Sequence, residues 1–277
     1  MKAMEAIKQR ISVRSYTDQP LPDQVRSKLE EGCRELKSGP FGAAVRLNLL
    51  DLEPLSPAEQ RSLGTYGVIR GARHYILGAV KKGKGSLEDI GYCMEKIVLE
   101  ATSLGLGTCW LGGTFRRSAF GARIDLTEAE MLPAVSPVGY PAKEISSADR
   151  IFRFGSRSRK RKPWNELFFS IDRNSPLTEA EAGDYRQILE AVRMGPSASN
   201  RQPWRIIRDE SGTYQLYMKE NEIYNNLLGK IHLQNVDMGI TMCHFEIAAH
   251  ELGLTGSWKV NGPAYEVPGL RHMATWR

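Results

Sequence analysis

Two long stretches of this chain carry apolar residues at helical spacing. In the first stretch they recur at i, i+4, i+7, i+11 and i+14, as Ile90, Met94, Ile97, Ala101 and Leu104. In the second stretch the matching residues are Met238, Met242, Phe245, Ala249 and Leu252. These stripes predict two long helices. We expect Ser86-x-x-Asp89 to cap the first helix, and a Leu-Gly-Leu turn to end both.

Shorter patterns predict further elements around these helices. One helix is expected after Pro22-Asp23, ending near Gly39-Pro40. Another follows the capping box Thr178-x-x-Glu181 and leads to Met194, with Gly195 as its stop. Runs of β-favouring residues predict strands at Val45–Leu52, His74–Val80, Ala134–Val138, Arg205–Arg208 and Thr213–Met218. Together these elements indicate an α+β fold.

The region of the first long helix recurs around the second. Eight identities align without a gap between the segments Asp89–Trp110 and Asp237–Trp258. Earlier in the chain, Gly39-Pro40 recurs as Gly195-Pro196. We therefore predict two similar α/β halves, residues 1–155 and 176–277, joined by a basic connector at 156–175. Core packing explains the two helix stripes, and a two-fold or pseudo-two-fold interface would also use them.

Composition narrows the class of protein. The apolar fraction of 41% and the charged fraction of 25% are ordinary for a globular protein. No apolar run reaches the roughly 18–20 residues of a membrane helix, and the first residues lack the apolar core of a secretion signal. Four scattered cysteines predict free thiols in a reducing cytosol and make a metal site unexpected. We expect a cytoplasmic protein with no membrane partner.

The net charge of +6 is densest at residues 157–162, Arg-Ser-Arg-Lys-Arg-Lys. This run suits a solvated linker, an arm that binds the phosphate of a cofactor, or a nucleic-acid patch. Aromatic residues that stack on bases are not interleaved with it, so nucleic acid is the least favoured partner.

Three segments have compositions that suit a flat anionic ligand. Arg10, Ser12 and Arg14 alternate, so an extended chain would point two guanidiniums and a hydroxyl the same way. The glycine-rich stretch Leu106–Gly113 allows close backbone approach, or simply ends a helix. Pro196–Trp204 combines a helix break with two side-chain amides that donate and accept hydrogen bonds. Those amides could instead tie down a turn, with Trp204 in the core.

Two of these segments resemble motifs of the FMN-dependent nitroreductase family. Pro196–Trp204 resembles its P-S-x-x-N-x-Q-P-W signature, and Arg10-Ile11-Ser12-Val13-Arg14 resembles its R-x-S-x-R element. The family's two motifs lie close in sequence, whereas here they are almost the whole chain apart. In that family FMN lies at a dimer interface and contacts both subunits. The resemblance covers most of this chain if its halves are treated as two copies.

The resemblance implies roles for particular residues. The phosphate would be held by Arg10, Ser12, Arg159 and Arg161. Arg14 would face the pyrimidine edge of the flavin, where positive charge stabilises the anionic reduced ring. Gly112 and Gly113 match the loop whose backbone approaches flavin N5. The contacts that the partner subunit makes with FMN in the family would come from the second half, through Pro196, Ser197, Ala198, Asn200 and Gln202.

Each half departs from the family pattern in a complementary way. The second half has no R-x-S-x-R element before Pro176, and the first half has Phe41-Gly42-Ala43-Ala44 in place of P-S-x-x-N. The Asn/Lys pair of many members has no clear match near Thr65–Gly67. The resemblance therefore implies a fused internal pseudo-dimer that is a monomer with one working FMN site, the other having decayed.

The activity implied is hydride transfer from NAD(P)H to a small acceptor such as a nitroaromatic or quinone, by ping-pong kinetics through FMN. Hydride transfer requires no acid–base side chain, and we nominate no catalytic residue. Relatives that dehalogenate iodotyrosine or consume flavin need a lid, which Leu55–Gly71 does not suggest. The alternative is a non-catalytic or specialised flavin-binding protein with a decayed second site.

Overall fold

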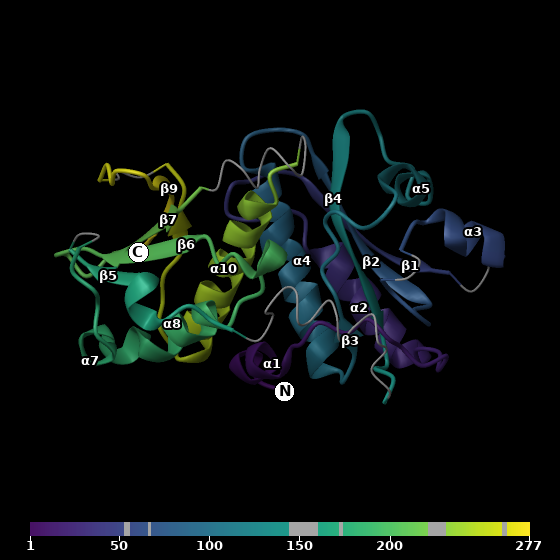
Figure 1. The fold of residues 1–277 in the computed structure, drawn as a ribbon, viewed down its shortest axis with the longest axis horizontal. Coiled ribbons are helices and arrows are strands. Elements are labelled where there is room, and N and C mark those ends of the chain that lie inside the picture. The colour runs from purple at the N-terminus through teal and green to yellow at the C-terminus, as the bar shows by residue number, and fades with distance from the viewer. Residues whose placement is uncertain (53–55, 66–67, 144–159, 172–173, 221–230, 262–264) are drawn as a thin grey trace.

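The computed structural model describes residues 1–277 except 53–55, 66–67, 144–159, 172–173, 221–230 and 262–264. Its centre is a pair of long helices, α4 (Ser86–Ser103) and α10 (Leu233–Glu251), which pack side by side. A sheet of four strands lies on one side of this pair, and a sheet of five strands lies on the other (Figure 1). The predicted α+β class is confirmed.

The first sheet is antiparallel, with the strand order β1-β2-β4-β3. Its strands are β1 (Val45–Asp51), β2 (His74–Lys81), β3 (Gly107–Thr108) and β4 (Glu130–Gly139). Helices α2 (Asp23–Glu35) and α4 pack against β1 and β2. The short helices α3 (Pro57–Ser62) and α5 (Arg117–Ala122) complete this part. The strands expected in this region are confirmed, although β4 begins earlier than predicted because Glu130 and Met131 still pair with β2.

The second sheet has the strand order β5-β6-β7-β9-β8. Its strands are β5 (Phe168–Ser170), β6 (Trp204–Arg208), β7 (Tyr214–Met218), β8 (Trp258–Lys259) and β9 (Arg271–Trp276). β5 pairs in parallel with β6, and the remaining pairs are antiparallel. Strand β5 comes from the predicted connector but belongs to this sheet. The last strand in sequence, β9, lies between β7 and β8.

The long helices touch through their backbones at two glycines. A Cβ atom on Gly91 would lie 2.1 Å from the carbonyl oxygen of Val236, and one on Gly239 would lie 1.8 Å from that of Glu88. Neither distance is possible for a real side chain, so glycine is required at both positions. A single cluster of buried apolar side chains includes residues of both helices and of both sheets.

The N-terminus of α4 differs from the expected cap. Gly85 is the N-cap residue, with a φ of 79°, and Ser86 donates to the carbonyl of Lys81 instead. The Asp89 carboxylate accepts the backbone N–H groups of Phe41 and Ala43, at 2.8 and 2.7 Å. The prediction of a Ser86 cap was wrong because glycine makes the turn, which releases Asp89 to hold a distant loop.

The capping box at Thr178 forms as predicted, but the helix that it starts is short. α7 (Glu179–Ala182) stops at Gly183, whose φ is 53°. A single 3-10 turn, Gly183–Tyr185, then leads into α8 (Arg186–Arg193). The expected continuous helix to Met194 is therefore interrupted, because glycine takes up a backbone conformation that does not continue a helix. Both Leu-Gly-Leu turns are confirmed, with Gly105 and Gly253 at φ values of 78° and 77°.

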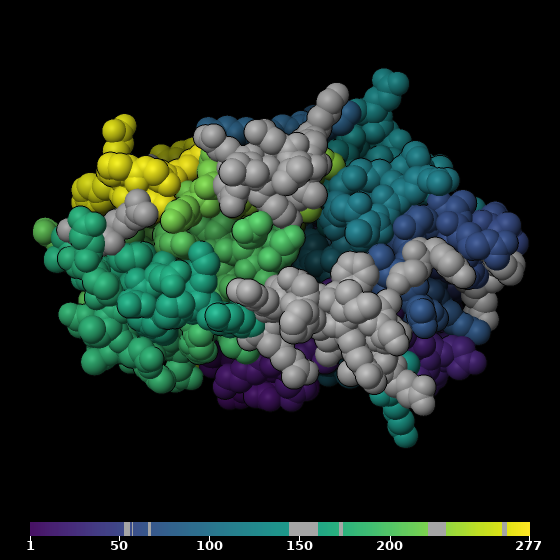
Figure 2. All heavy atoms as spheres, in the orientation of Figure 1, coloured from purple at the N-terminus to yellow at the C-terminus, as the bar shows by residue number. Residues whose placement is uncertain are grey.

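The N-terminal helix α1 (Ala3–Gln9) joins the two parts of the molecule. It packs against α4, α10 and α8, and Figure 2 shows it at the lower edge, below the green atoms of the C-terminal part. The four cysteines are buried and free, as predicted. Among the described residues no helix combines the length and apolar character needed to cross a membrane, and no cluster of side chains suits a metal ion. The division into two similar halves stays a prediction.

Candidate functional site

A hollow opens where the N-terminal segment after α1 meets the loop after α8. It encloses about 800 Å³ not filled by atoms, part of it open to solvent. Concave pockets lined by apolar surface and a few polar groups are typical binding sites for small-molecule ligands and cofactors. Its lining comprises Arg10, Ser12, Arg14, Trp110, Gly112, Ala134, Arg161, Pro196, Ser197, Ala198, Ser199, Asn200, Leu233, Val236, Asp237 and Ile240. Segments separated by almost the whole sequence thus form one pocket.

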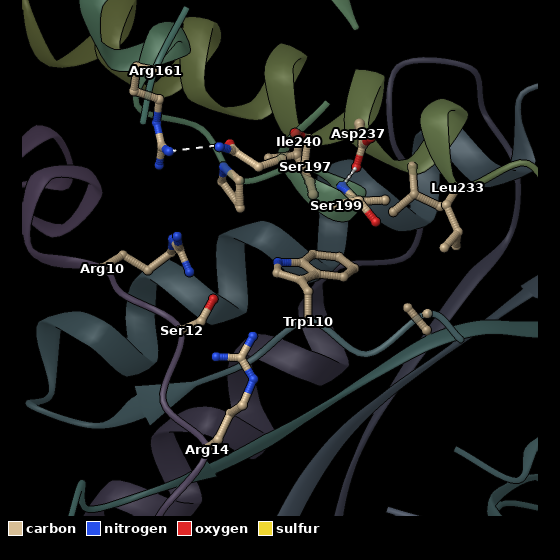
Figure 3. Close-up of a pocket in the computed structure, with 16 residues that line it drawn as sticks. Arg10, Ser12, Arg14, Trp110, Arg161, Ser197, Ser199, Leu233, Asp237 and Ile240 are labelled. Carbon is tan, nitrogen blue, oxygen red and sulfur yellow. Dashed lines mark hydrogen bonds between the residues drawn. The ribbon is translucent and has the colours of Figure 1, made fainter. Parts of the chain in front are cut away.

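The segment Arg10–Arg14 runs alongside β3. Ser12 forms a parallel bridge with Thr108, and the Val13 N–H donates to the Thr108 carbonyl at 2.8 Å. This pairing keeps the chain extended and buries the Val13 side chain. Arg10, Ser12 and Arg14 consequently all reach the pocket, as their alternation predicts (Figure 3).

One end of the pocket is strongly positive. The guanidiniums of Arg10 and Arg161 point into the same space from different elements (Figure 3). Arg10 is buried, and its Nη1 atom has no partner among the described residues. Burial, followed by the charges of Arg10 and Arg193, lowers the pKa of Arg161 to about 10. An anion placed here would offset the repulsion between the guanidiniums and accept a hydrogen bond from Arg10 Nη1.

The loop after α8 is held in an unusual backbone conformation. Ser199, Asn200 and Gln202 have φ values of 49°, 54° and 50°, in the left-handed region that non-glycine residues seldom adopt. Such residues persist where their surroundings enforce them, often at functional sites. Here the Gln202 N–H donates to Ser197 Oγ at 2.9 Å, which closes the loop on itself.

Side-chain amides fasten this loop to the end of the connector. Asn200 Nδ2 donates to the Lys160 carbonyl at 2.8 Å, and the Lys162 N–H donates to Gln202 Oε1 at 2.8 Å. Arg161, between those two residues, donates to the Met194 carbonyl at 3.0 Å and to Asn200 Oδ1 at 3.4 Å. The loop and the arginine therefore position each other.

Asp237, on the first turns of α10, reaches the pocket from its other side. Its side chain is buried, and Oδ1 accepts the Ala198 N–H at 2.9 Å (Figure 3). Oδ2 is buried without a partner among the described residues. Burial raises the pKa of Asp237 to about 8, and the Ala198 hydrogen bond opposes that rise. Sequence analysis did not nominate this residue, although its match with Asp89 in the repeat was a usable signal.

Trp110 forms part of the pocket wall and is anchored from behind. Its indole N–H donates to Glu95 Oε2 at 2.7 Å. Glu95 Oε1 lies 2.9 Å from His244 Nε2, and His244 Nδ1 donates to the Ala191 carbonyl at 2.9 Å. Glu95 and His244 are fully buried. This series of hydrogen bonds links the pocket to α4, α10 and α8. Sequence patterns gave no signal for the Glu95–His244 pair.

The family profile described as "Putative TM nitroreductase" matches residues 2–249. The chain belongs to this nitroreductase family. No curated protein matches the chain.

One solved structure shares the fold along the whole chain, and two others are similar to part of it. A putative nitroreductase from Thermotoga maritima superposes with a TM-score of 0.63 at 21% identity, covering all of this chain and 92% of that one. A nitroreductase family protein from Clostridium difficile 630 gives a TM-score of 0.46 at 21% identity, over 60% of this chain and 96% of that one. An FMN-dependent nitroreductase from Clostridium difficile R20291 gives 0.42 at 18% identity, over 52% and 92%. The first similarity extends the nitroreductase fold along the whole chain.

The pocket contains most of the residues named from the sequence. It gathers Arg10, Ser12, Arg14, Gly112, Arg161, Pro196, Ser197, Ala198 and Asn200. Gln202 is buried behind the loop, and Gly113 is exposed outside the lining. A Cβ on Gly112 would lie 2.6 Å from Leu233 Cδ1, so this glycine admits α10 to the pocket wall. Arg159 lies outside the described residues.

The first turns of α10 provide an apolar wall that was expected only as core. Leu233, Val236 and Ile240 line the pocket while packing against the central core. Sequence periodicity shows that such residues are buried, but it does not show that one edge of the helix stripe borders a cavity.

Proposed function

We propose that this protein is an FMN-dependent oxidoreductase that transfers hydride from NAD(P)H to a small acceptor such as a nitroaromatic or quinone. The observation that carries the proposal is the pocket that unites Arg10–Arg14 with Pro196–Asn200 in a nitroreductase fold. We further propose one FMN for each chain and ping-pong kinetics, because donor and acceptor would use the same pocket in turn.

The positive end of the pocket suits the phosphate of FMN. Arg10 and Arg161 supply guanidiniums, and Ser12 supplies a hydroxyl from the extended segment that follows Arg10. Nη1 of Arg10, which has no partner in the described part of the chain, is a donor that could bond to an anion. Arginine is well suited to this task because its planar donors pair with phosphate oxygens in a fixed geometry.

The remainder of the pocket suits a flavin ring. Leu233, Val236 and Ile240 supply apolar surface, and Trp110 supplies an aromatic face. Arg14 would place positive charge at the pyrimidine edge, where it favours an anionic reduced ring. FMN, when bound, supplies the hydride-transfer chemistry, and the chain orients it and excludes water.

A fused pseudo-dimer with one site accounts for the two unlike loops. The first-half loop at Phe41–Ala43 is bonded to both oxygens of Asp89, which does not line the pocket. The matched second-half loop is bonded to one oxygen of Asp237. We propose a cytoplasmic monomer, because the interface that the family forms between subunits would lie within the chain. Gel filtration at several concentrations tests this state.

Anaerobic titration of the purified protein tests the function. The protein should be yellow, contain about one FMN for each chain, and lose its colour when NADH or NADPH is added. A colourless protein that cannot be reconstituted with FMN would overturn the proposal. A yellow protein that neither nucleotide reduces would instead identify a non-catalytic flavin-binding protein.

A further inference from the structure

One carboxyl oxygen of Asp237 has no hydrogen-bond partner among the residues that the structure describes. The residue is only 3% exposed, yet it lines the pocket at the start of α10. Its Oδ1 is bonded to the Ala198 N–H, whereas its Oδ2 has no partner among the described residues. A buried polar atom without a partner destabilises the protein, so a ligand that bonded to it would bind more tightly.

Asp89 provides an internal comparison. It occupies the matching position at the start of α4, and its carboxylate also holds the backbone of the matching loop. Both Asp89 oxygens accept backbone N–H groups, from Phe41 and Ala43, and Asp89 does not line the pocket. Holding the loop therefore accounts for both oxygens of Asp89. It accounts for Oδ1 of Asp237 but not for Oδ2.

We propose that Asp237 contacts the ligand of the pocket directly, with Oδ1 holding the Ala198 backbone and Oδ2 carrying a proton that it donates to an acceptor atom of FMN. The ligand identity rests on the proposed function. Asp237 would thus be a binding residue that fixes the ligand relative to the strained loop, in addition to the arginines at the opposite end of the pocket.

The protonated form follows from the surroundings of Asp237. A buried carboxylate with one unpaired oxygen is strongly disfavoured, and burial raises the pKa of this group to about 8. Because Oδ1 accepts the Ala198 N–H, the proton belongs on Oδ2. FMN offers carbonyl oxygens, ring nitrogens, hydroxyls and phosphate oxygens as acceptors.

Charged groups near Asp237 come from the rest of the pocket and from helix α4. The pocket contributes Arg10, Arg14 and Arg161. The packed helix α4 contributes Glu88, bonded to Asn235 at 2.6 Å, and Glu95, bonded to His244 on α10. None of these charges ranks among the causes of the Asp237 pKa shift, which are burial and the Ala198 hydrogen bond. Titration of Asp237 should consequently be separable from theirs.

Three variants separate a ligand contact from a loop anchor. Asp237→Asn keeps an oxygen for the Ala198 N–H and places an N–H donor where Oδ2–H stood, but it cannot ionise. Asp237→Ala removes both. Asp89→Asn is the matched control, because it alters the other loop and leaves the pocket intact. FMN dissociation constants are measured by flavin fluorescence at pH 6.5 and pH 9, with folding checked by circular dichroism.

We expect wild type and Asp237→Asn to bind FMN within about threefold of each other at pH 6.5. At pH 9 wild type should bind roughly tenfold more weakly than Asp237→Asn, because the carboxyl has then ionised and lost its donor. Titration of FMN itself affects both proteins equally and cancels in this ratio. Asp237→Ala should bind at least tenfold more weakly at pH 6.5, and Asp89→Asn should follow wild type.

Two results would overturn the inference while leaving the proposed function intact. One is FMN binding to Asp237→Ala as tight as to wild type. The other is the same pH dependence in wild type and Asp237→Asn, which also decides the matter if Asp237→Ala does not fold. Failure of wild type to bind FMN at either pH would overturn the proposed function and this inference together.

Discussion

Glu95 on α4 and His244 on α10 form a fully buried pair, with Oε1 and Nε2 2.9 Å apart. The remaining polar atoms of both side chains are also bonded, to the Trp110 indole and to the Ala191 carbonyl. Since a carbonyl only accepts, His244 Nδ1 is the donor in its hydrogen bond with Ala191. The pair thereby joins the two central helices and fixes one wall of the pocket.

Replacing Glu95 with alanine should lower the free energy of unfolding by about 3–5 kcal/mol, because His244 and Trp110 would lose a buried partner. Glu95→Gln retains an acceptor for the indole and a polar group for the imidazole, so its loss should be clearly smaller. Urea denaturation followed by tryptophan fluorescence measures both. Glu100→Ala, on the same helix but partly exposed, serves as the control. Equal losses in the alanine and glutamine variants would contradict this account.

The close contact between the central helices at Gly239 predicts that alanine there destabilises the protein, the opposite of its usual effect in a helix. Alanine usually stabilises a helix relative to glycine by about 1 kcal/mol. Gly239→Ala should instead destabilise the protein by at least about 2–3 kcal/mol, because the new methyl group would overlap the Glu88 carbonyl. Gly32→Ala in α2 is the control, since its closest obstructions are the ends of the Glu100 and Ile97 side chains. Thermal unfolding of the two variants gives the comparison.

The positive end of the pocket predicts discrimination between FMN and riboflavin, which lacks the phosphate. Arg10→Ala should weaken FMN binding by roughly tenfold to a hundredfold, the value of a charge-assisted hydrogen bond. Riboflavin binding should change little. Arg186→Ala removes an exposed arginine bonded to Glu179 and should affect neither ligand. Equal weakening of both flavins by Arg10→Ala would place the phosphate elsewhere.

Asn200 should matter through the position of Arg161. Its amide donates to the Lys160 carbonyl and accepts from Arg161, so Asn200→Ala releases both the loop and the guanidinium. We expect FMN binding to weaken several-fold with little change in thermal stability, because the residue lies at the edge of the core. Asn48→Ala, on β1 and outside the pocket lining, is the control. An unchanged FMN dissociation constant would show that the loop is not part of the site.

The raised pKa of Asp237 predicts a pH dependence of stability in the protein without flavin. The pKa of this carboxyl is about 8 in the folded protein and near 3.9 in the unfolded chain. Its contribution to the free energy of unfolding is therefore at its full value below about pH 4. That contribution is lost as the pH rises from the unfolded pKa towards the folded one, because the unfolded chain releases this proton first. Urea midpoints between pH 5.5 and pH 9 should therefore fall more for wild type than for Asp237→Asn. Parallel curves would show that Asp237 does not titrate in this range.

Local sequence predicted much of the fold. The long helices, their Leu-Gly-Leu ends and the strands β1, β2, β6 and β7 all follow from periodicity and glycine placement, because these signals act over a few residues. The interruption between α7 and α8 escaped prediction, since one glycine after a capping box can either end a helix or continue it. Strand β9 also escaped, because its partners β7 and β8 are distant in sequence.

The sequence by itself determined the family resemblance, the alternating pattern Arg10-x-Ser12-x-Arg14 and the amide-rich loop that contains Asn200. Only the tertiary structure decided which residues share a pocket. It brought Asp237 and Trp110 to that pocket and turned the Gln202 amide towards the connector. The physical reason is that burial and hydrogen-bond satisfaction depend on neighbours far away in sequence. Among the described residues, both oxygens of Asp89 have partners but only one oxygen of Asp237 does. What packs around two otherwise equivalent helix ends settles this difference.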